Sequence, residues 1–393
     1  MKKNICVITC NRSEYGLLRF VMREIDSSSS LELKLLVSGA HLSGDFGSTI
    51  SEIRADGFKI NKKVYLLPGE HSPTETIKSM SDAMLKFAKA FKDLKVSLII
   101  ILGDRYESFA AACTAMILNI PIAHIHGGEV TSGAFDDRIR HSITKMAILH
   151  FVAANEYKRR VIQLGENPNR VFQVGGLGIE NIRRLKLIKK ASLEKILNIK
   201  FREKSLLVTF HPVTLEYRTQ EKQLGELLSA LSGYKNFTII FTLSNNDPGG
   251  AIFNKKIKNF VKNNPNSVLF DSLGSLLYLS CMAIVDVVVG NSSSGILEAP
   301  ALKKAVVNIG SRQDGRLMAS NIICCKPNKT KIESSINKAL SKKFREKLAS
   351  TVNPFGNGNA SKKIVRILEN VDLQLNKKFF FDSINLKKIY QGI

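Results

Sequence analysis

Residues 96–104 read VSLIIILGD, and this stretch decides the fold class. A strand with one face in water alternates apolar and polar residues, whereas an unbroken apolar run indicates a strand buried on both faces of a parallel sheet. The run ends in glycine and aspartate, which is typical of a strand that passes into a loop. Similar strands are predicted, with helical patterns between them, at residues 4–10, 31–39, 120–128, 150–155 and 170–178.

The alternation of strand and helix restarts in the second half of the chain. Strands are predicted at residues 205–212, 237–247, 283–295 and 304–310. The glycine-led, charged stretch 175–204 is low in core residues and marks the predicted domain boundary. Repeated βα units form doubly wound parallel sheets. We therefore predict an α/β protein with two Rossmann-like domains facing a central cleft, at residues 1–178 and 179–365, followed by a helical C-terminal tail at residues 366–393.

Polar and glycine residues gather where the predicted strands end. The stretches concerned are CNRSEYG, LGDRYE, HIHGGE, HPVT, SNND, GNSSSG and IGSRQDGR. In open α/β sheets, ligands bind beyond the carboxyl ends of the strands. Each stretch alone is explained as an ordinary turn between strand and helix, but their joint occurrence predicts one site in the cleft between the domains.

The stretch GNSSSG at residues 290–295 predicts an anion site. Two glycines bracket three serines where a strand passes into a helix, and backbone N–H groups at a helix start bind phosphate. Simple capping of the helix is the alternative. The Walker motif GxxxxGK[ST] is absent, and no GxGxxG follows the first strand, which argues against nicotinamide binding there. Glu298 is placed to accept ribose hydroxyls, and three arginines suit a diphosphate: Arg12, Arg105 and Arg312.

Carboxylates near two strand ends predict proton transfer. Asp104 directly follows the buried run, and Asp136 and Asp137 begin a predicted helix. Capping and compensation of the helix dipole explain one member of that pair, but adjacent carboxylates also push pKa values apart. Glu107 is expected on a helix surface. No GxSxG stretch is present, so nucleophilic acyl transfer is not expected.

The histidines allow two interpretations. His124 and His126 have the H-x-H spacing of some metal sites, and a metal would need a third ligand such as Asp104 or His211. Acid–base chemistry or phosphate contact is the preferred interpretation, because carboxylates lie nearby. His211 ends the first strand of the second domain and is expected to face the cleft, whereas His141 is expected to be structural.

Composition limits the remaining classes of protein. The formal charge is +24, but the basic residues are scattered and form no nucleic-acid-binding module, so no nucleic-acid partner is expected. No apolar run reaches the roughly 18 residues of a membrane helix, and the apolar run near the start is too short for a signal peptide. The six cysteines lack CxxC spacing. We expect free thiols and a cytoplasmic protein without a membrane partner or a metal.

Taken together, the motifs resemble the UDP-N-acetylglucosamine 2-epimerase family, and most of all its hydrolysing branch. The resemblance implies a GT-B-like pair of Rossmann domains, UDP held mainly by the second domain, no cofactor, and a homodimer or homotetramer. The matching stretches occur in the family's order between about residues 5 and 370: RSEYGLL, SGAHLSGDFGSTISEI, LGDRYE, HIHGGE, DDRIRHSITKM, FHPVT, GNSSSGILE and IGSRQDGR.

The resemblance also implies roles for individual residues. The UDP-binding positions are Arg12, Ser13, Arg105, His211, Asn245, Ser292, Ser293, Glu298 and Arg312. The catalytic positions are Asp104, Glu129, Asp136 and Asp137, with His126 and His211 as further candidates. Some relatives have a glutamate where His126 stands. Many have glycine and threonine before the first arginine, where this chain has Cys10 and Asn11.

The implied reaction converts UDP-N-acetylglucosamine and water into N-acetylmannosamine and UDP, as in sialic acid synthesis. It proceeds by anti elimination to a 2-acetamidoglucal, followed by addition of water. The same reaction on UDP-2,4-diacetamido-2,4,6-trideoxyglucose, for legionaminic acid synthesis, is equally compatible with the motifs. A non-hydrolysing epimerase and a GT-B glycosyltransferase are also compatible with the fold, although the clustered carboxylates of the first domain argue against a transferase.

Overall fold

The structure is a computed structural model, and it describes residues 2–42, 49–66, 73–130, 136–213, 216, 218–243, 250–373 and 380–381. The chain divides into two compact units. Unit 1 comprises the described parts of residues 1–129, 135–181 and 358–393, and unit 2 comprises those of residues 130–134 and 182–357. The boundary at 181/182 lies close to the one expected from the sequence, but the chain also returns to unit 1 at residue 358.

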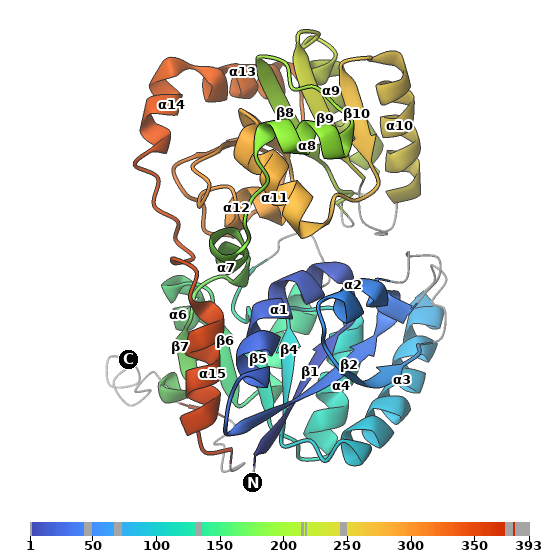
Figure 1. The fold of residues 1–393 in the computed structure, drawn as a ribbon, viewed down its shortest axis with the longest axis vertical. Coiled ribbons are helices and arrows are strands. Elements are labelled where there is room, and N and C mark those ends of the chain that lie inside the picture. The colour runs from blue at the N-terminus through green and yellow to red at the C-terminus, as the bar shows by residue number, and fades with distance from the viewer. Residues whose placement is uncertain are drawn as a thin grey trace, which may run out of the picture. The chain divides into compact units, whose positions relative to one another are not determined.

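Unit 1 is built on a parallel sheet with the strand order β3-β2-β1-β4-β5-β6-β7 (Figure 1). The order reverses between the neighbours β1 and β4, and such a switch point is where doubly wound sheets bind ligands. The strands are β1 (Lys3–Thr9), β2 (Leu31–Ser38), β3 (Ile60–Val64), β4 (Leu98–Leu102), β5 (Ile122–Ile125), β6 (Leu149–Val152) and β7 (Val171–Gln173).

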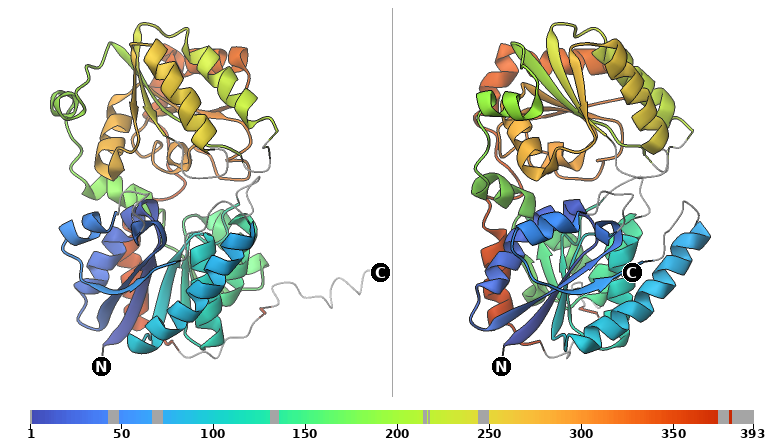
Figure 2. Two further views of the ribbon diagram at one scale, coloured as in Figure 1. Left: turned by 90° about the vertical axis from the view of Figure 1, so that its right-hand side faces the viewer. Right: turned by 45° about the vertical axis from the view of Figure 1, so that its right-hand side comes forward.

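Helices cover both faces of this sheet (Figure 2). Every residue of β4 is buried, as its unbroken apolar run predicted. Leu98, Ile100 and Leu102 pack in one core with α1 and α15, whereas Ile99 and Ile101 pack in a second core with α3, α4 and α5. The helices are α1 (Arg12–Asp26), η1 (Gly39–Leu42), α2 (Ile50–Ala55), α3 (Pro73–Asp93), α4 (Tyr106–Ile117), α5 (Asp136–Met146), α6 (Asn155–Gln163), η3 (Pro168–Arg170), α7 (Leu177–Arg184), which continues into unit 2, and α15 (Ala360–Asn370).

Unit 2 repeats this plan with the strand order β10-β9-β8-β11-β12-β13, and its switch point lies between β8 and β11. Leu206 and Val208 of β8 face a core with α9 and α13, whereas Leu207 faces a core with α8 and α11. The strands are β8 (Lys204–Thr209), β9 (Phe237–Thr242), β10 (Ser267–Phe270), β11 (Val287–Gly290), β12 (Ala305–Ile309) and β13 (Ile322–Cys325). The helices are α8 (Lys190–Leu197), α9 (Gln220–Leu231), α10 (Gly250–Asn263), α11 (Gly274–Ile284), α12 (Ser293–Leu297), α13 (Lys329–Leu340) and α14 (Lys342–Leu348).

Helix α15 belongs to unit 1 and packs against α1. At its start, the carboxylate of Glu180 accepts hydrogen bonds from the backbone N–H of Ser361 at 2.8 Å and from its hydroxyl at 2.5 Å. At its end, Lys3 donates from Nζ to three carbonyl oxygens, those of Leu368, Glu369 and Val371, at 2.9–3.1 Å. The polar backbone groups at both ends of α15 therefore find hydrogen-bond partners in unit 1. Residues 358–365 were predicted to belong to the second domain, but these contacts hold them in unit 1. Of the helical tail predicted at residues 366–393, residues 366–370 lie in α15, and residues 371–373 and 380–381 are not helical. The rest of the tail lies outside the described residues.

The predicted fold class is confirmed, because both units are doubly wound parallel α/β sheets. All strands predicted from the sequence are present, and all but β1 are shorter than predicted. The strands β3, β10 and β13 were not predicted from the sequence, and each lies at the edge of its sheet. Among the described residues, no helix combines the length and the hydropathy needed to cross a bilayer.

Candidate active site

The start of α1 lies at the switch point of unit 1. Asn11 caps the helix, because its Oδ1 accepts a hydrogen bond from the backbone N–H of Glu14 at 3.0 Å. The hydroxyl of Ser13 donates to the same oxygen at 2.6 Å. Arg12 is the first residue of the helix, and its guanidinium forms an ion pair with Glu52 at 2.5 Å. Arg12 and Ser13 therefore lie beside the switch point of the sheet, and Arg12 is already paired to a carboxylate.

Two buried carboxylates lie beside this edge. Glu107 is 2% exposed and accepts hydrogen bonds from Nε and Nη2 of Arg105 at 3.2 and 3.3 Å. The prediction of a surface position for Glu107 is therefore wrong, because its carboxylate turns toward Arg105 rather than toward water. Glu14 accepts a hydrogen bond from the N–H of Cys10 at 2.8 Å, and its Oε1 has no hydrogen-bond partner within the described ranges. Burial raises the pKa of Glu14 to about 7, against the opposing charge of Arg105.

A single buried guanidinium connects the predicted acid–base residues of unit 1. Arg140 of α5 donates from Nη1 to Oδ1 of Asp137 at 3.0 Å and to the carbonyl oxygen of Glu129 at 2.9 Å, and from Nη2 to Oδ2 of Asp104. Its side chain is 5% exposed. Burial opposes the charge on Arg140, but the carboxylates of Asp104, Glu129, Asp137 and Asp136 outweigh that effect, and the pKa of Arg140 is raised. The four predicted carboxylates thus surround one permanent cation.

His126 and Glu129 form a second pair beside this cation. Both side chains are buried, and Nδ1 of His126 lies 3.0 Å from Oε1 of Glu129. His126 has a φ of 65°, a left-handed conformation that few residues other than glycine adopt, and its N–H is bonded to the carbonyl oxygen of Phe151. Its Nε2 is buried and has no hydrogen-bond partner within the described part of the chain. The backbone therefore holds His126 in a strained position in which one ring nitrogen can bind a further group.

The neighbouring His124 has a structural position. It is fully buried in β5, with Nε2 at 2.7 Å from the carbonyl oxygen of Gly103 and Nδ1 at 3.1 Å from the hydroxyl of Thr144. Burial lowers the pKa of His124 to about 3, so its ring is neutral. His124 and His126 thus contact different groups. In the described ranges, no set of three or more His, Cys, Asp or Glu side chains is arranged to hold a metal ion.

In unit 2, a glycine lets two strand ends approach closely. Gly290 ends β11 with a φ of 137°, and a Cβ at this position would lie 1.9 Å from the carbonyl oxygen of Thr209 on β8. The following residue, Asn291, is buried and accepts the backbone N–H of His211 at 2.7 Å through Oδ1. It also donates from Nδ2 to the carbonyl oxygen of His211 at 2.8 Å. One amide side chain therefore ties the ends of β8 and β11 together at the switch point.

Two predicted UDP-binding residues, Arg312 and His211, lie beside Asn291. Arg312 donates from Nη1 to the carbonyl oxygen of Asn291 at 3.0 Å, and Gln313 donates from Nε2 to the same oxygen at 2.8 Å. His211 is 6% exposed, and burial, helped by the charge of Arg312, lowers its pKa to about 3. The His211 ring is therefore neutral, and it can serve a phosphate as a hydrogen-bond donor rather than as a cation.

The serines that follow form a chain of hydroxyl groups. Ser292 caps α12, because its Oγ accepts the N–H of Ser294 at 3.4 Å. The hydroxyl of Ser294 donates to Ser292 at 3.0 Å and lies 2.6 Å from that of Tyr278, which lies 3.4 Å from that of Thr209. Ser293 is the first residue of α12 and is half-buried. Capping therefore accounts for Ser292 and leaves Ser293 at the edge predicted to bind an anion.

Three residues named in the sequence predictions remain to be placed: Glu298, His141 and Asn245. Glu298, predicted to accept ribose hydroxyls, is half-buried and follows α12 as its C-cap residue. Its negative charge adds to the effect of burial, which raises the pKa of Tyr278. His141 is about one-quarter exposed, and its Nε2 lies 3.5 Å from Oδ2 of Asp137. Asn245 lies outside the described residues.

Arg140, Asn291 and Tyr278 are among the residues of these clusters that the sequence motifs did not predict. Arg140 follows Asp137 by one helical turn, so the i,i+3 spacing in DDRIR is a signal that could have revealed it. Asn291 stands within the quoted GNSSSG, where only the serines received a role. Tyr278 lies in the apolar helix α11, where no nearby motif marks it.

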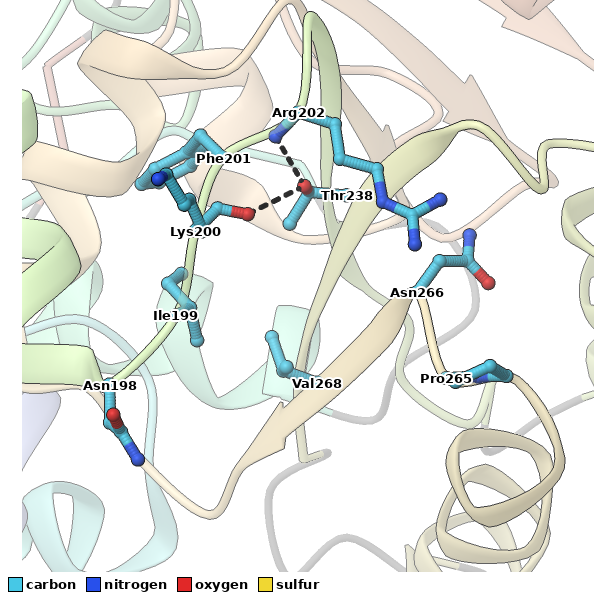
Figure 3. Close-up of a pocket in the computed structure, with 9 residues that line it drawn as sticks. All are labelled: Asn198, Ile199, Lys200, Phe201, Arg202, Thr238, Pro265, Asn266 and Val268. Atoms are coloured by element: carbon cyan, nitrogen blue, oxygen red, sulfur yellow. Dashed lines mark hydrogen bonds between the residues drawn. The ribbon is translucent and has the colours of Figure 1, made fainter.

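A hollow on unit 2 lies away from the residues of unit 2 described above (Figure 3). It is lined by the segment before β8 and by the first residues of β9 and β10, including Lys200, Arg202 and Thr238. The backbone N–H of Arg202 donates to the hydroxyl of Thr238 at 2.8 Å. The hollow thus lies at the amino ends of the strands, opposite the edge that carries the predicted UDP-binding residues.

Comparisons with known proteins agree with the sequence motifs. The sequence model of the family described as UDP-N-acetylglucosamine 2-epimerase matches residues 23–369. The chain is 42% identical over 382 residues to the GDP/UDP-N,N'-diacetylbacillosamine 2-epimerase (hydrolyzing) of Campylobacter jejuni, covering 96% of this chain and 99% of that protein. It is 39% identical over 386 residues to the polysialic acid biosynthesis protein P7 of Escherichia coli, covering 97% of each.

A solved structure has the same fold. The UDP-GlcNAc 2-epimerase of Neisseria meningitidis, bound to UDP-GlcNAc, matches with a TM-score of 0.71 at 20% identity, covering 93% of this chain and 99% of that one. The family match extends over most of the chain and includes both units. This chain therefore belongs to the UDP-N-acetylglucosamine 2-epimerase family, and to its hydrolysing branch, as its motifs indicated.

Proposed function

We propose that this chain is a hydrolysing 2-epimerase of a UDP-activated 2-acetamido sugar, with UDP bound mainly by unit 2 and the sugar by unit 1. The observation that carries the proposal is the group around Arg140, where carboxylates from the ends of β4 and β5 and from the start of α5 meet. Elimination at a sugar needs a carboxylate base, because the C2 proton is only weakly acidic. This group supplies such a base at the ligand-binding edge of a doubly wound sheet.

Asp104 is the proposed base. Its Oδ2 is bound by Arg140, whereas its Oδ1 has no hydrogen-bond partner among the described residues, and its side chain is 21% exposed. In Asp137, Oδ1 accepts a hydrogen bond from Arg140, and Oδ2 lies 3.5 Å from Nε2 of His141. A general base needs an accessible oxygen that reaches the proton it removes. Asp104 presents such an oxygen, and Arg140 keeps the carboxylate in a fixed position.

The proposed reaction has two steps. In the first, Asp104 takes the proton from C2, the electrons of the C2–H bond form a C1=C2 double bond, and the C1–O bond breaks with its electron pair leaving on UDP. In the second, water adds its hydroxyl group to C1 and gives up its remaining proton to solvent. A proton is added to C2 on the face opposite to the one from which Asp104 removed the first proton. The buried pair His126–Glu129 is the proposed source of that proton. Asp104 then releases its proton to solvent, and the donor of the new C2 proton regains one from solvent. The overall reaction is redox-neutral, so it calls for no redox cofactor.

Departure of UDP requires donors for the developing charge on the diphosphate. Unit 2 offers the neutral ring of His211, the hydroxyl groups around Ser293 and the guanidinium of Arg312 at one sheet edge. We propose that these groups bind the diphosphate, and that Arg12 and Arg105 of unit 1 add positive charge when substrate is present. The ion pairs that Arg12 and Arg105 form with Glu52 and Glu107 must then loosen or be shared.

Two sugars are candidate substrates. The relative at 42% identity is named for N,N'-diacetylbacillosamine, which favours the UDP-diacetamido-trideoxy sugar as the first substrate to test. The relative at 39% identity is named for polysialic acid biosynthesis, which keeps UDP-N-acetylglucosamine as the second. Both sugars carry the 2-acetamido group and the C2 proton on which the proposed chemistry acts. The difference between them lies at C4 and C6 of the sugar.

Proton NMR in D2O tests the proposal. The protein is incubated separately with UDP-N,N'-diacetylbacillosamine and with UDP-N-acetylglucosamine. We expect free UDP and a free sugar of manno configuration with deuterium at C2, because the proton returned to C2 comes from solvent. A free sugar of unchanged configuration without deuterium would indicate simple hydrolysis instead. If neither sugar is converted, the proposed function is wrong.

A further inference from the structure

The guanidinium of Arg140 is buried, and it donates hydrogen bonds to three different segments of the chain. Its acceptors are the carboxylate of Asp104 after β4, the backbone carbonyl of Glu129 after β5, and the carboxylate of Asp137 in its own helix. A guanidinium is planar and presents several N–H groups in fixed directions, so it can hold such acceptors in one arrangement. Lysine, with a single nitrogen on a flexible chain, cannot reproduce this arrangement.

A purely structural role is the alternative for Arg140. Buried arginines often neutralise buried carboxylates without any part in chemistry. Here, however, the acceptors are not buried to the same degree: the side chains of Asp104 and Asp137 are 21% and 26% exposed, whereas that of Arg140 is 5% exposed. The guanidinium thus contacts two carboxylates that remain partly exposed. This arrangement suits carboxylates that must meet a ligand in a fixed orientation.

We propose that Arg140 is a positioning residue of the epimerisation, which holds the carboxylates of Asp104 and Asp137 in the geometry that proton transfer at C2 requires. The inference rests on the proposed function. Arg140 itself touches neither the sugar nor UDP, and it acts through the two carboxylates. Asp136 and Glu129 also interact with the charge of Arg140, and so does His124 of β5. His126 and His141 lie beside Glu129 and Asp137.

The permanent charge of Arg140 has a consequence for the pH profile. A cation next to a carboxylate base favours the ionised, active form of that base. Removing the cation should therefore move the acid limb of the kcat profile to higher pH, in addition to lowering kcat. A residue needed only for folding would lower the amount of active protein and leave the limb where it was. The position of the limb thus separates the two explanations.

The test uses three variants of the full chain. Arg140→Met removes the charge and the hydrogen bonds at similar length, and Arg140→Lys keeps the charge but loses the planar arrangement. Arg138→Met is the matched control, because Arg138 lies on the same helix and is exposed. The rate of UDP release and the incorporation of deuterium at C2 are measured from pH 5 to pH 9, with KM and the melting temperature recorded for each variant.

The expected result has a distinct pattern. Arg140→Met should lose on the order of 100-fold in kcat, with little change in KM and an acid limb at higher pH. Arg140→Lys should lose kcat with a smaller movement of the limb, and Arg138→Met should behave like the wild type. Wild-type kcat in Arg140→Met, or reduced activity with an unmoved limb in both Arg140 variants, would overturn the inference. Inactivity of the wild type on both sugars would instead refute the proposed function.

Discussion

Gly290→Ala should destabilise unit 2 at the sheet edge that is predicted to bind UDP. Gly290 ends β11 directly opposite Thr209 of β8 in the parallel register. The new Cβ would lie 1.9 Å from the carbonyl oxygen of Thr209 and 2.7 Å from its carbonyl carbon. Both atoms belong to the backbone, so no side-chain rotation can relieve the overlap. The two strand ends would have to separate, and the bonds from Asn291 to His211 would be stretched with them.

The size of the effect follows from two contributions. A side chain forced to keep the φ of 137° costs about 1–3 kcal/mol. Inserting a methyl group into a closely packed backbone contact costs about 1–3 kcal/mol more. The total, ~2–6 kcal/mol, is a large part of the ~5–15 kcal/mol that stabilises a typical domain. For a unit of this size, even the lower value lowers the melting temperature by at least ~4 °C.

Calorimetry of the wild type, Gly290→Ala and a control tests this prediction. The control is Gly225→Ala, because Gly225 is exposed in α9 and a Cβ there would meet no atom within 4 Å. Alanine should stabilise that helix by ~1 kcal/mol, so the control should melt at a slightly higher temperature. Titration with UDP, followed by heat release, should show weaker binding by Gly290→Ala and unchanged binding by Gly225→Ala.

Two results for Gly290→Ala would contradict this prediction. If Gly290→Ala melts within about 1 °C of the wild type, less than a ΔΔG of ~1 kcal/mol would produce in a unit of this size, the contact between Gly290 and Thr209 does not limit the fold. If it melts lower but binds UDP normally, the glycine serves only stability, and the close approach of the strand ends is not required for the nucleotide.

Three further predictions concern groups that bind protons. Asp104→Asn should bind UDP like the wild type in calorimetry but lose at least ~100-fold in turnover, and normal turnover would remove Asp104 from the mechanism. Burial lowers the pKa of His124 from 6.5 to about 3, so in this range the unfolded chain binds a proton that the native protein does not. Stability in urea should therefore fall as the pH falls from 6.5 to 3, and His124→Gln should weaken that dependence. Burial raises the pKa of Glu14 from 4.5 to about 7, so the stability that the protonated group contributes below pH 4.5 is lost as the pH rises to 7. Glu14→Gln should remove this loss in the same measurement, and a steeper loss would contradict it.

The inner strands of both sheets could be predicted because burial on two faces leaves an unbroken apolar run. The strands β4 and β11 are fully buried and were found. The missed strands β3, β10 and β13 lie at sheet edges, and most of their residues are partly exposed. In β3, the sequence INKKV carries two lysines, which suits an edge exposed to water but hides the strand from a search for apolar runs.

The candidate site could be predicted in part, because topology alone brings the carboxyl ends of parallel strands to one edge. Asp104 and His211 were placed by this rule. Their partners could not be placed in the same way, because a hydrogen bond such as that between Thr209 and Tyr278 joins residues 69 positions apart. Glu107 was misjudged for a related reason, since its place in the first turn of α4 gives no information about Arg105 turning toward it.

The cluster around Arg140 in unit 1 and the cluster around Asn291 in unit 2 differ in charge. The difference agrees with the proposal that unit 1 transfers protons and unit 2 binds the leaving diphosphate. In unit 1, the groups around Arg140 are ionisable, and a permanent cation orders carboxylates that can exchange protons. In unit 2, apart from Arg312 and Glu298, the described groups are a neutral histidine, amides and hydroxyl groups already linked by hydrogen bonds. Neutral donors bind an anion without holding a fixed excess of positive charge, so a diphosphate can be bound and later released. Ionisable groups suit the making and breaking of C–H bonds, and neutral donors suit a leaving group that must depart.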